Sequence, residues 1–221
     1  MSGVTGVSGV NEVGHDLAAL LRVHRVMAIV RGNSAQAAAA TARVLLEEGV
    51  ALVEVTLTTP GALDIIAELV AERPSGALIG AGTVLTRGDV ADVVAAGGQF
   101  TVTPCPAESV EASVAAGLPV AAGAYTAGEA YGVWRAGASV VKLFPAAAGG
   151  PAYLRALRDP FPQMPLMAVG GVGADHLAEY IAAGALGAGV GGPLAGDAPS
   201  GGDLGELRRR ARRFCEVAAQ C

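Results

Sequence analysis

The sequence predicts a single-domain (β/α)8 barrel, because short apolar runs and longer amphipathic stretches alternate about eight times along its 221 residues. Glycine follows several of the amphipathic stretches, as is common where a helix ends before the next strand. These glycines are Gly49, Gly97, Gly117, Gly137 and Gly184. A doubly wound open sheet is the alternative. That fold more commonly carries a phosphate fingerprint after its first strand, and Arg31-Gly32-Asn33-Ser34 is not one.

The eight candidate strands are short runs of apolar and β-branched residues, which is typical of buried parallel strands. In chain order they are Val26–Val30, Leu52–Leu57, Leu78–Ala81, Phe100–Thr103, Pro119–Ala122, Val140–Phe144, Leu166–Val169 and Gly187–Val190. One helical stretch follows each strand. These stretches are Ala35–Glu48, Ala62–Glu72, Arg87–Ala96, Ala107–Ala116, Ala127–Ala136, Ala152–Leu157, Ala174–Ala183 and Leu204–Ala219. We expect residues 14–221 to form the barrel and residues 1–13, rich in Gly, Ser and Val, to be a flexible segment and not a signal peptide.

The net charge of −5 argues against nucleic acid as a partner. One basic cluster exists, at residues 208–213, and apolar residues thread it at helical spacing: Leu204, Leu207, Ala211, Phe214 and Ala218. That pattern predicts the solvated face of a terminal helix.

The few cysteines and histidines lack the spacing of a metal site or a disulfide framework. They are Cys105, Cys215, Cys221, His15, His24 and His176. We therefore expect no metal, no other cofactor and a reducing compartment. No apolar run reaches the roughly 18 residues that a bilayer span requires, so we expect no membrane association and a cytoplasmic location.

Lys142 is the only lysine of the chain, beside 14 arginines, and it sits within the apolar run Val140–Phe144. Burial disfavours the ammonium form, and only the free amine attacks a carbonyl, so this setting predicts a Schiff-base nucleophile. A bias toward arginine codons would also explain the scarcity of lysine, but it would not explain the location.

Strand parity predicts which side chains share the barrel interior. On the second, fourth and sixth candidate strands the polar residues Glu54, Thr103 and Lys142 each fall on the side that we expect to face inward. Arg31 and Thr83 follow the first and third strands, so all five side chains should converge at the carboxyl end of the barrel, where active sites lie. A stabilising Glu54–Lys142 ion pair is the structural alternative.

Six short motifs occur in an order and at a spacing that resemble one enzyme family. The motifs are Ala28-Ile29-Val30-Arg31-Gly32, Glu54-Val55-Thr56-Leu57, Gly80-Ala81-Gly82-Thr83-Val84-Leu85, Thr103-Pro104, Lys142-Leu143-Phe144-Pro145 and Val169-Gly170-Gly171-Val172. Over about residues 15 to 200 the chain resembles the class I aldolases that cleave 2-keto-3-deoxy-6-phosphogluconate, 2-keto-3-deoxy-6-phosphogalactonate or 4-hydroxy-2-oxoglutarate. The resemblance implies a (β/α)8 barrel, a homotrimer and a reaction without metal.

The resemblance also implies roles for individual residues. Lys142 matches the Schiff-base lysine and Glu54 the acid/base glutamate. Thr83 matches the threonine that binds the substrate carboxylate, and Arg31 matches an arginine that binds an anionic group. Other matching positions pack around the pyruvyl part or hold the phosphate through backbone N–H groups: Pro104, Phe144, Val169, Gly170, Gly171, Gly191 and Gly192.

Two positions depart from the family pattern. Thr58 stands where many gluconate-type members have an arginine, and Pro193 follows the second glycine pair where many members have a residue with a free N–H. Meanwhile Val169 before its glycine pair, the loop at 149–154 and the ending at 187–194 look closer to the phosphogalactonate branch.

The resemblance implies cleavage of a phosphorylated 2-keto-3-deoxy sugar acid to pyruvate and glyceraldehyde 3-phosphate. It leaves open the gluco or galacto configuration and whether 4-hydroxy-2-oxoglutarate is also cleaved to pyruvate and glyoxylate. Two alternatives remain. One is a phosphate-binding barrel that forms no imine and that isomerises or epimerises sugar phosphates or couples small phosphorylated rings. The other is a non-catalytic barrel that only binds phosphorylated acids.

Overall fold

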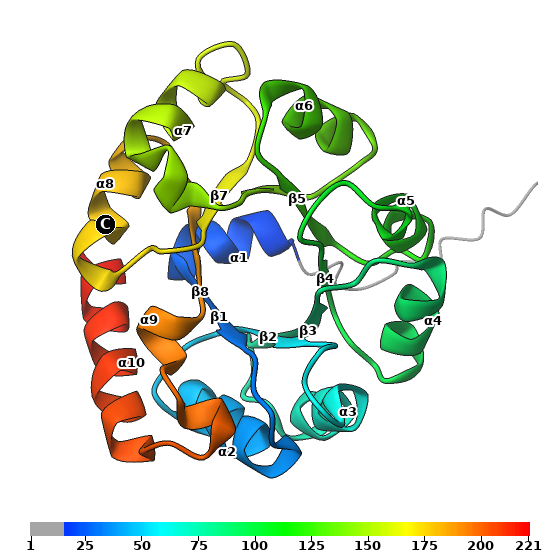
Figure 1. Cartoon of the computed structure of the whole chain (residues 1–221), viewed down its shortest axis with the longest axis vertical. Coiled ribbons are helices and arrows are strands. Elements are labelled where there is room, and N and C mark those ends of the chain that lie inside the picture. The colour runs from blue at the N-terminus through cyan, green and yellow to red at the C-terminus, as the bar shows by residue number, and fades with distance from the viewer. Residues whose placement is uncertain (1–15) are drawn as a thin grey trace, which may run out of the picture.

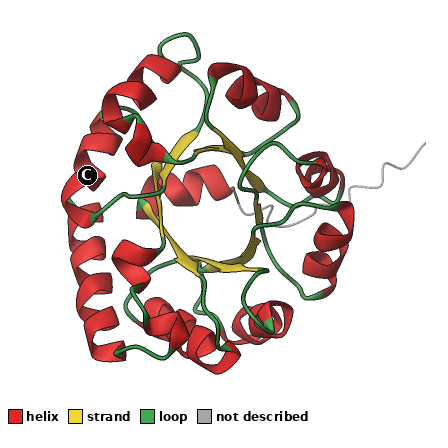
Figure 2. Ribbon diagram, in the orientation of Figure 1, coloured by secondary structure: helices red, strands yellow, loops and turns green. Residues whose placement is uncertain are grey.

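A computed structural model describes residues 16–221, so the expected flexible segment 1–13 and His15 lie outside the described residues. Eight parallel strands close into a barrel in the order β1 to β8, and helices surround it (Figures 1 and 2). The predicted (β/α)8 barrel is therefore confirmed. The strands are β1 (Val26–Val30), β2 (Leu52–Thr56), β3 (Leu78–Gly82), β4 (Thr101–Val102), β5 (Val120–Ala124), β6 (Val140–Leu143), β7 (Leu166–Val169) and β8 (Gly187–Val190).

Each predicted helix is present, with ends that differ from the predicted ones by at most a few residues. The α-helices are α1 (Leu17–His24), α2 (Ala35–Glu47), α3 (Ala62–Glu72), α4 (Arg87–Ala95), α5 (Glu108–Ala115), α6 (Ala127–Arg135), α7 (Gly150–Arg158), α8 (Ala174–Ala182), α9 (Gly192–Ala195) and α10 (Leu204–Ala218). Two 3-10 turns, η1 (Ala146–Ala148) and η2 (Ala198–Ser200), complete the list. The five glycines expected to end helices all have positive φ, which is typical of the residue just after a helix.

The sequence analysis did not predict α1, which lies across one opening of the barrel (Figure 1). Asp16 caps this helix by accepting a hydrogen bond from the Ala19 N–H at 3.0 Å. Leu17 and Leu21 are fully buried in the same apolar cluster as residues from the amino-terminal ends of the strands. The helix thus closes the barrel at the end opposite the carboxyl ends of the strands.

The barrel interior and the layer between barrel and helices form two separate apolar clusters. The interior cluster takes alternate residues from the strands, among them Met27, Leu52, Leu78, Phe100, Val102, Ala121, Val140, Met167 and Val169. The residues between them, such as Val53 and Val141, belong to the cluster that packs against the helices. Two positions beyond Leu52 and Val140 are Glu54 and Lys142, so the predicted parity is confirmed on β2 and β6.

The prediction was wrong on β4. Val102 faces the interior, and Thr101 hydrogen-bonds Ser113 of α5 at 2.8 Å on the helix side. Thr103 shares the parity of Thr101, so its side chain does not join Glu54 and Lys142. Burying a hydroxyl costs little free energy when it has a hydrogen-bond partner on a helix. The polar side of this strand therefore faces the helices.

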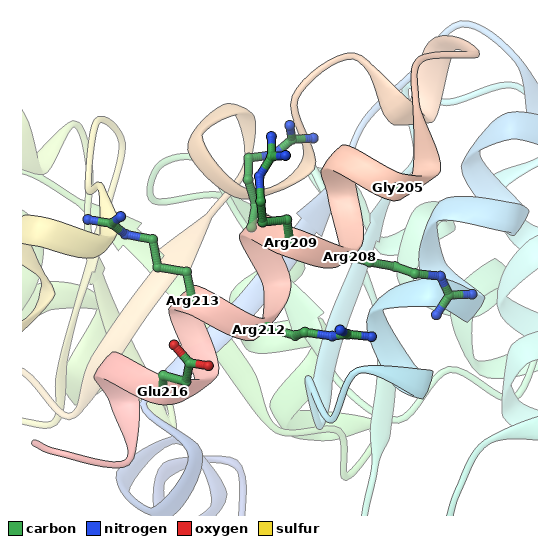
Figure 3. Close-up of a pocket in the computed structure, with 7 residues that line it drawn as sticks. Gly205, Arg208, Arg209, Arg212, Arg213 and Glu216 are labelled. Carbon is green, nitrogen blue, oxygen red and sulfur yellow. The ribbon is translucent and has the colours of Figure 1, made fainter.

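The basic run forms one face of α10, as expected (Figure 3). Four of the five apolar residues that thread the run, all except Leu204, are buried against the rest of the fold. Arg208 and Arg212 reach the residue that follows α2, Glu48, and pair with it at 2.8 and 2.6 Å. Between residues 16 and 221 no helix is both long and apolar enough to cross a bilayer.

Candidate active site

The Glu54 side chain lies in the interior of the barrel, in space that is free because Gly82 on the neighbouring strand has no side chain. Glu54 of β2 pairs with Gly80 of β3, and Gly82 lies two residues further along β3, on the same side of the strand. A Cβ on Gly82 would come within 1.6 Å of Glu54 Oε1, so the carboxyl keeps its present position only because residue 82 is glycine. The Gly-Ala-Gly run of β3 is visible in the sequence, but its relation to Glu54 becomes apparent only from the register of the two strands.

Glu54 is only 1% exposed, and its Oε2 atom has no hydrogen-bond partner among the described residues. Burial raises the pKa of this carboxyl above its ordinary value, while the positive charges of Lys142 and Arg31 act in the opposite direction. An unpartnered buried carboxyl oxygen is expensive unless a ligand or a proton uses it.

Lys142 projects into the same interior from β6 and is 6% exposed. Burial lowers the pKa of this amine, the negative charge of Glu54 acts in the opposite direction, and the positive charge of Arg31 lowers the pKa further. Within residues 16–221 the two groups form no ion pair at the 4.0 Å limit, so the proposed structural alternative is not realised. The amine lies 5.3 Å from the centre of the Phe144 ring.

Arg31 and Thr83 meet at the mouth of the barrel, where Arg31 Nη2 donates to Thr83 Oγ1 at 3.2 Å. Thr83 follows β3 with a φ of 60°, a left-handed conformation that a β-branched residue rarely adopts. Such a conformation costs about 1–3 kcal/mol and persists where the surroundings enforce it, often at functional sites. The predicted convergence of these two residues is therefore present in the structure.

Thr103 has a different position from the predicted one. Its hydroxyl donates to the Cys105 carbonyl at 2.7 Å and accepts from the Gly123 N–H at 3.0 Å. A Cβ on Gly123 would lie 2.3 Å from the Pro104 carbonyl carbon, so the loop after β4 rests directly on β5. Gly123 pairs with Lys142 in the strand register. Thr103 thus fixes the Pro104 loop beside Lys142 without entering the barrel interior.

The predicted glycine pairs form turns at the carboxyl ends of β7 and β8. Gly170 and Gly171, directly after Val169, have φ angles of 96° and 77°. The Phe144 ring lies 3.1 Å from where a Cβ of Gly170 would be, which brings Phe144 against this turn. Gly191 and Gly192 begin the one-turn helix α9.

The two departures from the family pattern also have defined places. The Thr58 hydroxyl lies 3.1 Å from that of Thr56, whose own hydroxyl lies 3.1 Å from that of Thr59. Pro193 occupies the first turn of α9, where proline is tolerated. In the described part of the chain no group of three or more His, Cys, Asp or Glu side chains is arranged to hold a metal ion.

Comparison with known proteins gives consistent results. Residues 17–205 match the family described as KDPG and KHG aldolase. The 2-dehydro-3-deoxy-6-phosphogalactonate aldolase of Escherichia coli (strain K12) is 38% identical over 171 residues, covering 76% of this chain and 83% of the relative.

Two solved structures resemble the fold closely. One described as "Native KDPGal structure" has a TM-score of 0.82 and 34% identity, covering 89% of this chain and 96% of that one. A KDPG aldolase from Legionella pneumophila, with pyruvate captured as a covalent carbinolamine intermediate, has a TM-score of 0.76 and 28% identity. That match covers 92% of this chain and 96% of the other.

Proposed function

Since the chain belongs to the KDPG and KHG aldolase family, we propose a role in the aldolase reaction for each residue of the site. The enzyme is an aldehyde-lyase of the Schiff-base class that acts on a phosphorylated keto acid and releases pyruvate and an aldehyde. The observation that carries the proposal is a single buried lysine, with a lowered pKa, facing a buried glutamate in the barrel interior.

Lys142 is the nucleophile. Its neutral amine adds to the C2 carbonyl of the substrate, and loss of water gives an iminium ion. Burial lowers the pKa of the amine and so increases the fraction that is neutral and able to attack. The carbinolamine captured in the Legionella pneumophila relative is the intermediate expected before that loss of water.

Glu54 is the acid/base residue. The carboxylate accepts the proton of the C4 hydroxyl while the C3–C4 bond breaks, the aldehyde leaves, and the bond electrons pass into the iminium to form an enamine. The protonated carboxyl then returns a proton to C3, and water hydrolyses the imine to release pyruvate. The raised pKa of this carboxyl suits a group that must both accept and return a proton.

Thr83 and Arg31 bind the substrate carboxylate or another anionic group at the barrel mouth, and their mutual hydrogen bond orients both side chains. Pro104 and Phe144 pack around the pyruvyl part. The backbone N–H groups of Gly170, Gly171, Gly191 and Gly192, with Val169 beside them, hold the phosphate.

The preferred substrate is 2-keto-3-deoxy-6-phosphogalactonate, which gives pyruvate and glyceraldehyde 3-phosphate. Support comes from the phosphogalactonate aldolase of E. coli, 38% identical, and from the presence of Thr58 where many gluconate-type members carry an arginine. The phosphogluconate isomer and 4-hydroxy-2-oxoglutarate are candidate secondary substrates. We also propose a cytoplasmic homotrimer as the working form, with residues 14–221 of each chain as the catalytic barrel.

Trapping with pyruvate and sodium borohydride tests this function. The folded chain should gain one reduced pyruvate imine by intact mass, and a peptide digest should place it on Lys142 and not on the N-terminal amine. Lys142→Ala should remain folded, lose the adduct and lose cleavage. A folded wild-type chain without an adduct would favour an imine-free phosphate-binding barrel.

A further inference from the structure

One arginine of the basic run is held differently from the others. Among the described residues the other four pair with carboxylates: Arg208 with Glu47 and Glu48, Arg209 with Glu206, Arg212 with Glu48, and Arg213 with Asp175. Figure 3 shows Arg208 and Arg212 directed toward one side of α10 and Arg213 toward the other. Arg210 has no carboxylate partner within 4.0 Å in residues 16–221.

Arg210 instead binds the end of α9. Its Nε donates to the Leu194 carbonyl at 2.7 Å and its Nη2 to the Ala195 carbonyl at 3.0 Å. Arg210 is half-buried, and so are both of these hydrogen bonds. A Cβ on Gly196 would lie 2.6 Å from Nη2, so a glycine makes room for the guanidinium there.

Helix α9 depends on such an external contact. It spans only Gly192–Ala195, and a single helical turn is not stable on its own. The last carbonyls of a helix lack partners within the helix, and a cation at that end interacts favourably with them. Arg210 supplies both the donors and the positive charge.

The same turn of helix begins at the candidate phosphate site. Gly191 and Gly192 follow β8 directly, so a shift of α9 moves their N–H groups relative to the barrel mouth. The segment beyond α9 has its own anchor, because Ser200 Oγ accepts from the Asn33 N–H at 3.3 Å. Loss of the Arg210 contact should therefore loosen α9 without releasing the whole connection.

We propose that Arg210 is a positioning residue that holds α9, and with it the Gly191–Gly192 turn, in the geometry that binds the substrate phosphate. This inference rests on the proposed function. It assigns a role in the reaction to a side chain outside the barrel, on the helix farthest along the chain.

The test compares Arg210→Ala with Arg209→Ala, a neighbour on α10 whose exposed side chain, among residues 16–221, pairs with Glu206 alone. We would measure kcat and KM for 2-keto-3-deoxy-6-phosphogalactonate and for its unphosphorylated counterpart, together with pyruvate trapping. Arg210→Ala should raise KM for the phosphorylated substrate by about tenfold, the effect of losing one charged hydrogen bond of ordinary strength. Arg209→Ala should leave it unchanged.

The unphosphorylated substrate and pyruvate have no phosphate, so their kinetics and trapping should not change in Arg210→Ala. Arg210→Lys should recover part of the affinity, because an ammonium can donate to a carbonyl but lacks the guanidinium fork. If Arg210→Ala does not fold, Arg210→Lys compared with Arg209→Lys replaces it, with a smaller rise in the same KM expected.

The proposal would be overturned if Arg210→Ala had the same KM for the phosphorylated substrate as Arg209→Ala. It would also be overturned if Arg210→Ala raised KM equally for the phosphorylated and the unphosphorylated substrate. Absence of pyruvate trapping in the wild-type chain would instead overturn the proposed function and, with it, the role of Arg210.

Discussion

Gly82→Ala should separate imine formation from carbon–carbon cleavage. The new Cβ would lie 1.6 Å from Glu54 Oε1 and 2.3 Å from the carboxyl carbon. Because nonbonded carbon and oxygen atoms need roughly 3.0–3.4 Å, the carboxyl must withdraw by about 1.5 Å. Lys142 lies on β6, three strands away from β3 in the barrel, and should keep its position.

The expected magnitude follows from that displacement. A misplacement of about 1 Å at a reacting group can cost about 100-fold in rate, and removing a general acid–base costs about 100- to 10,000-fold. We therefore expect kcat for cleavage to fall at least about 100-fold, within the range expected for Glu54→Gln. The pyruvate adduct on Lys142 should still form. Overpacking should also lower the free energy of unfolding by about 1–3 kcal/mol.

The assay pairs steady-state pyruvate release with borohydride trapping and a thermal melt. Gly132→Ala is the matched control, because Gly132 lies in α6 and a Cβ there meets nothing within 4 Å. A kcat for Gly82→Ala within about threefold of the control would refute the placement of Glu54 as the acid/base residue. If Gly82→Ala is too unstable, adding Glu54→Ala should remove the three clashing atoms of Glu54 and raise the melting temperature, which tests the same contact.

Further predictions concern Glu54 and the threonines of β4. Glu54→Gln should slow cleavage by about 100- to 10,000-fold while the imine still forms, which trapping would detect, and unchanged cleavage would make Glu54 structural. Glu54→Gln should also gain stability relative to the wild type as the pH rises above 4.5. Burial raises the pKa of the Glu54 carboxyl in the folded state, so ionising it costs more in the folded wild type than in the unfolded wild type, and the variant has no such group. A melting-temperature difference that does not change with pH would contradict this. Thr103→Val should lower kcat/KM, because the Cys105 carbonyl and the Gly123 N–H lose their partner, and Thr103→Ser should restore it. Thr101→Val on the helix side of β4 should reduce thermal stability alone, and equal activities for the two valine variants would count against a positioning role.

The sequence predicted the parts of the site that depend on strand parity within long, regular strands. Glu54 and Lys142 each share a side with an apolar interior residue two positions earlier, so their convergence followed from a period of two. Arg31 and Thr83 followed from their places after neighbouring strands, and their hydrogen bond agrees with that expectation.

Parity alone failed where the partner of a polar group lies far along the chain. The two threonines around Val102 suggested a polar interior side on β4, but the Thr101 hydroxyl finds Ser113 on α5. Likewise, the space for Glu54 depends on Gly82 on another strand, and only the register reveals that relation.

Helix α1 was missed for a different reason. The strand–helix alternation gave no place for a helix before the first strand, although Asp16 followed by Leu17 and Leu21 is a readable cap and apolar spacing. Helix α9, at four residues, is too short for any periodicity to predict.

Because α1 closes one end of the barrel, substrate and products must enter and leave at the other end. Leu17 and Leu21 fill the amino-terminal end together with the interior side chains of the strands, so entry and exit share the single mouth at the carboxyl ends. In the proposed reaction the pyruvyl part stays bonded to Lys142 in the interior, while the phosphorylated aldehyde occupies the rim. The aldehyde must then depart first and pyruvate second, and synthesis in the reverse direction must load pyruvate first. Product inhibition should follow that sequence, with pyruvate competing against the full substrate for the free enzyme.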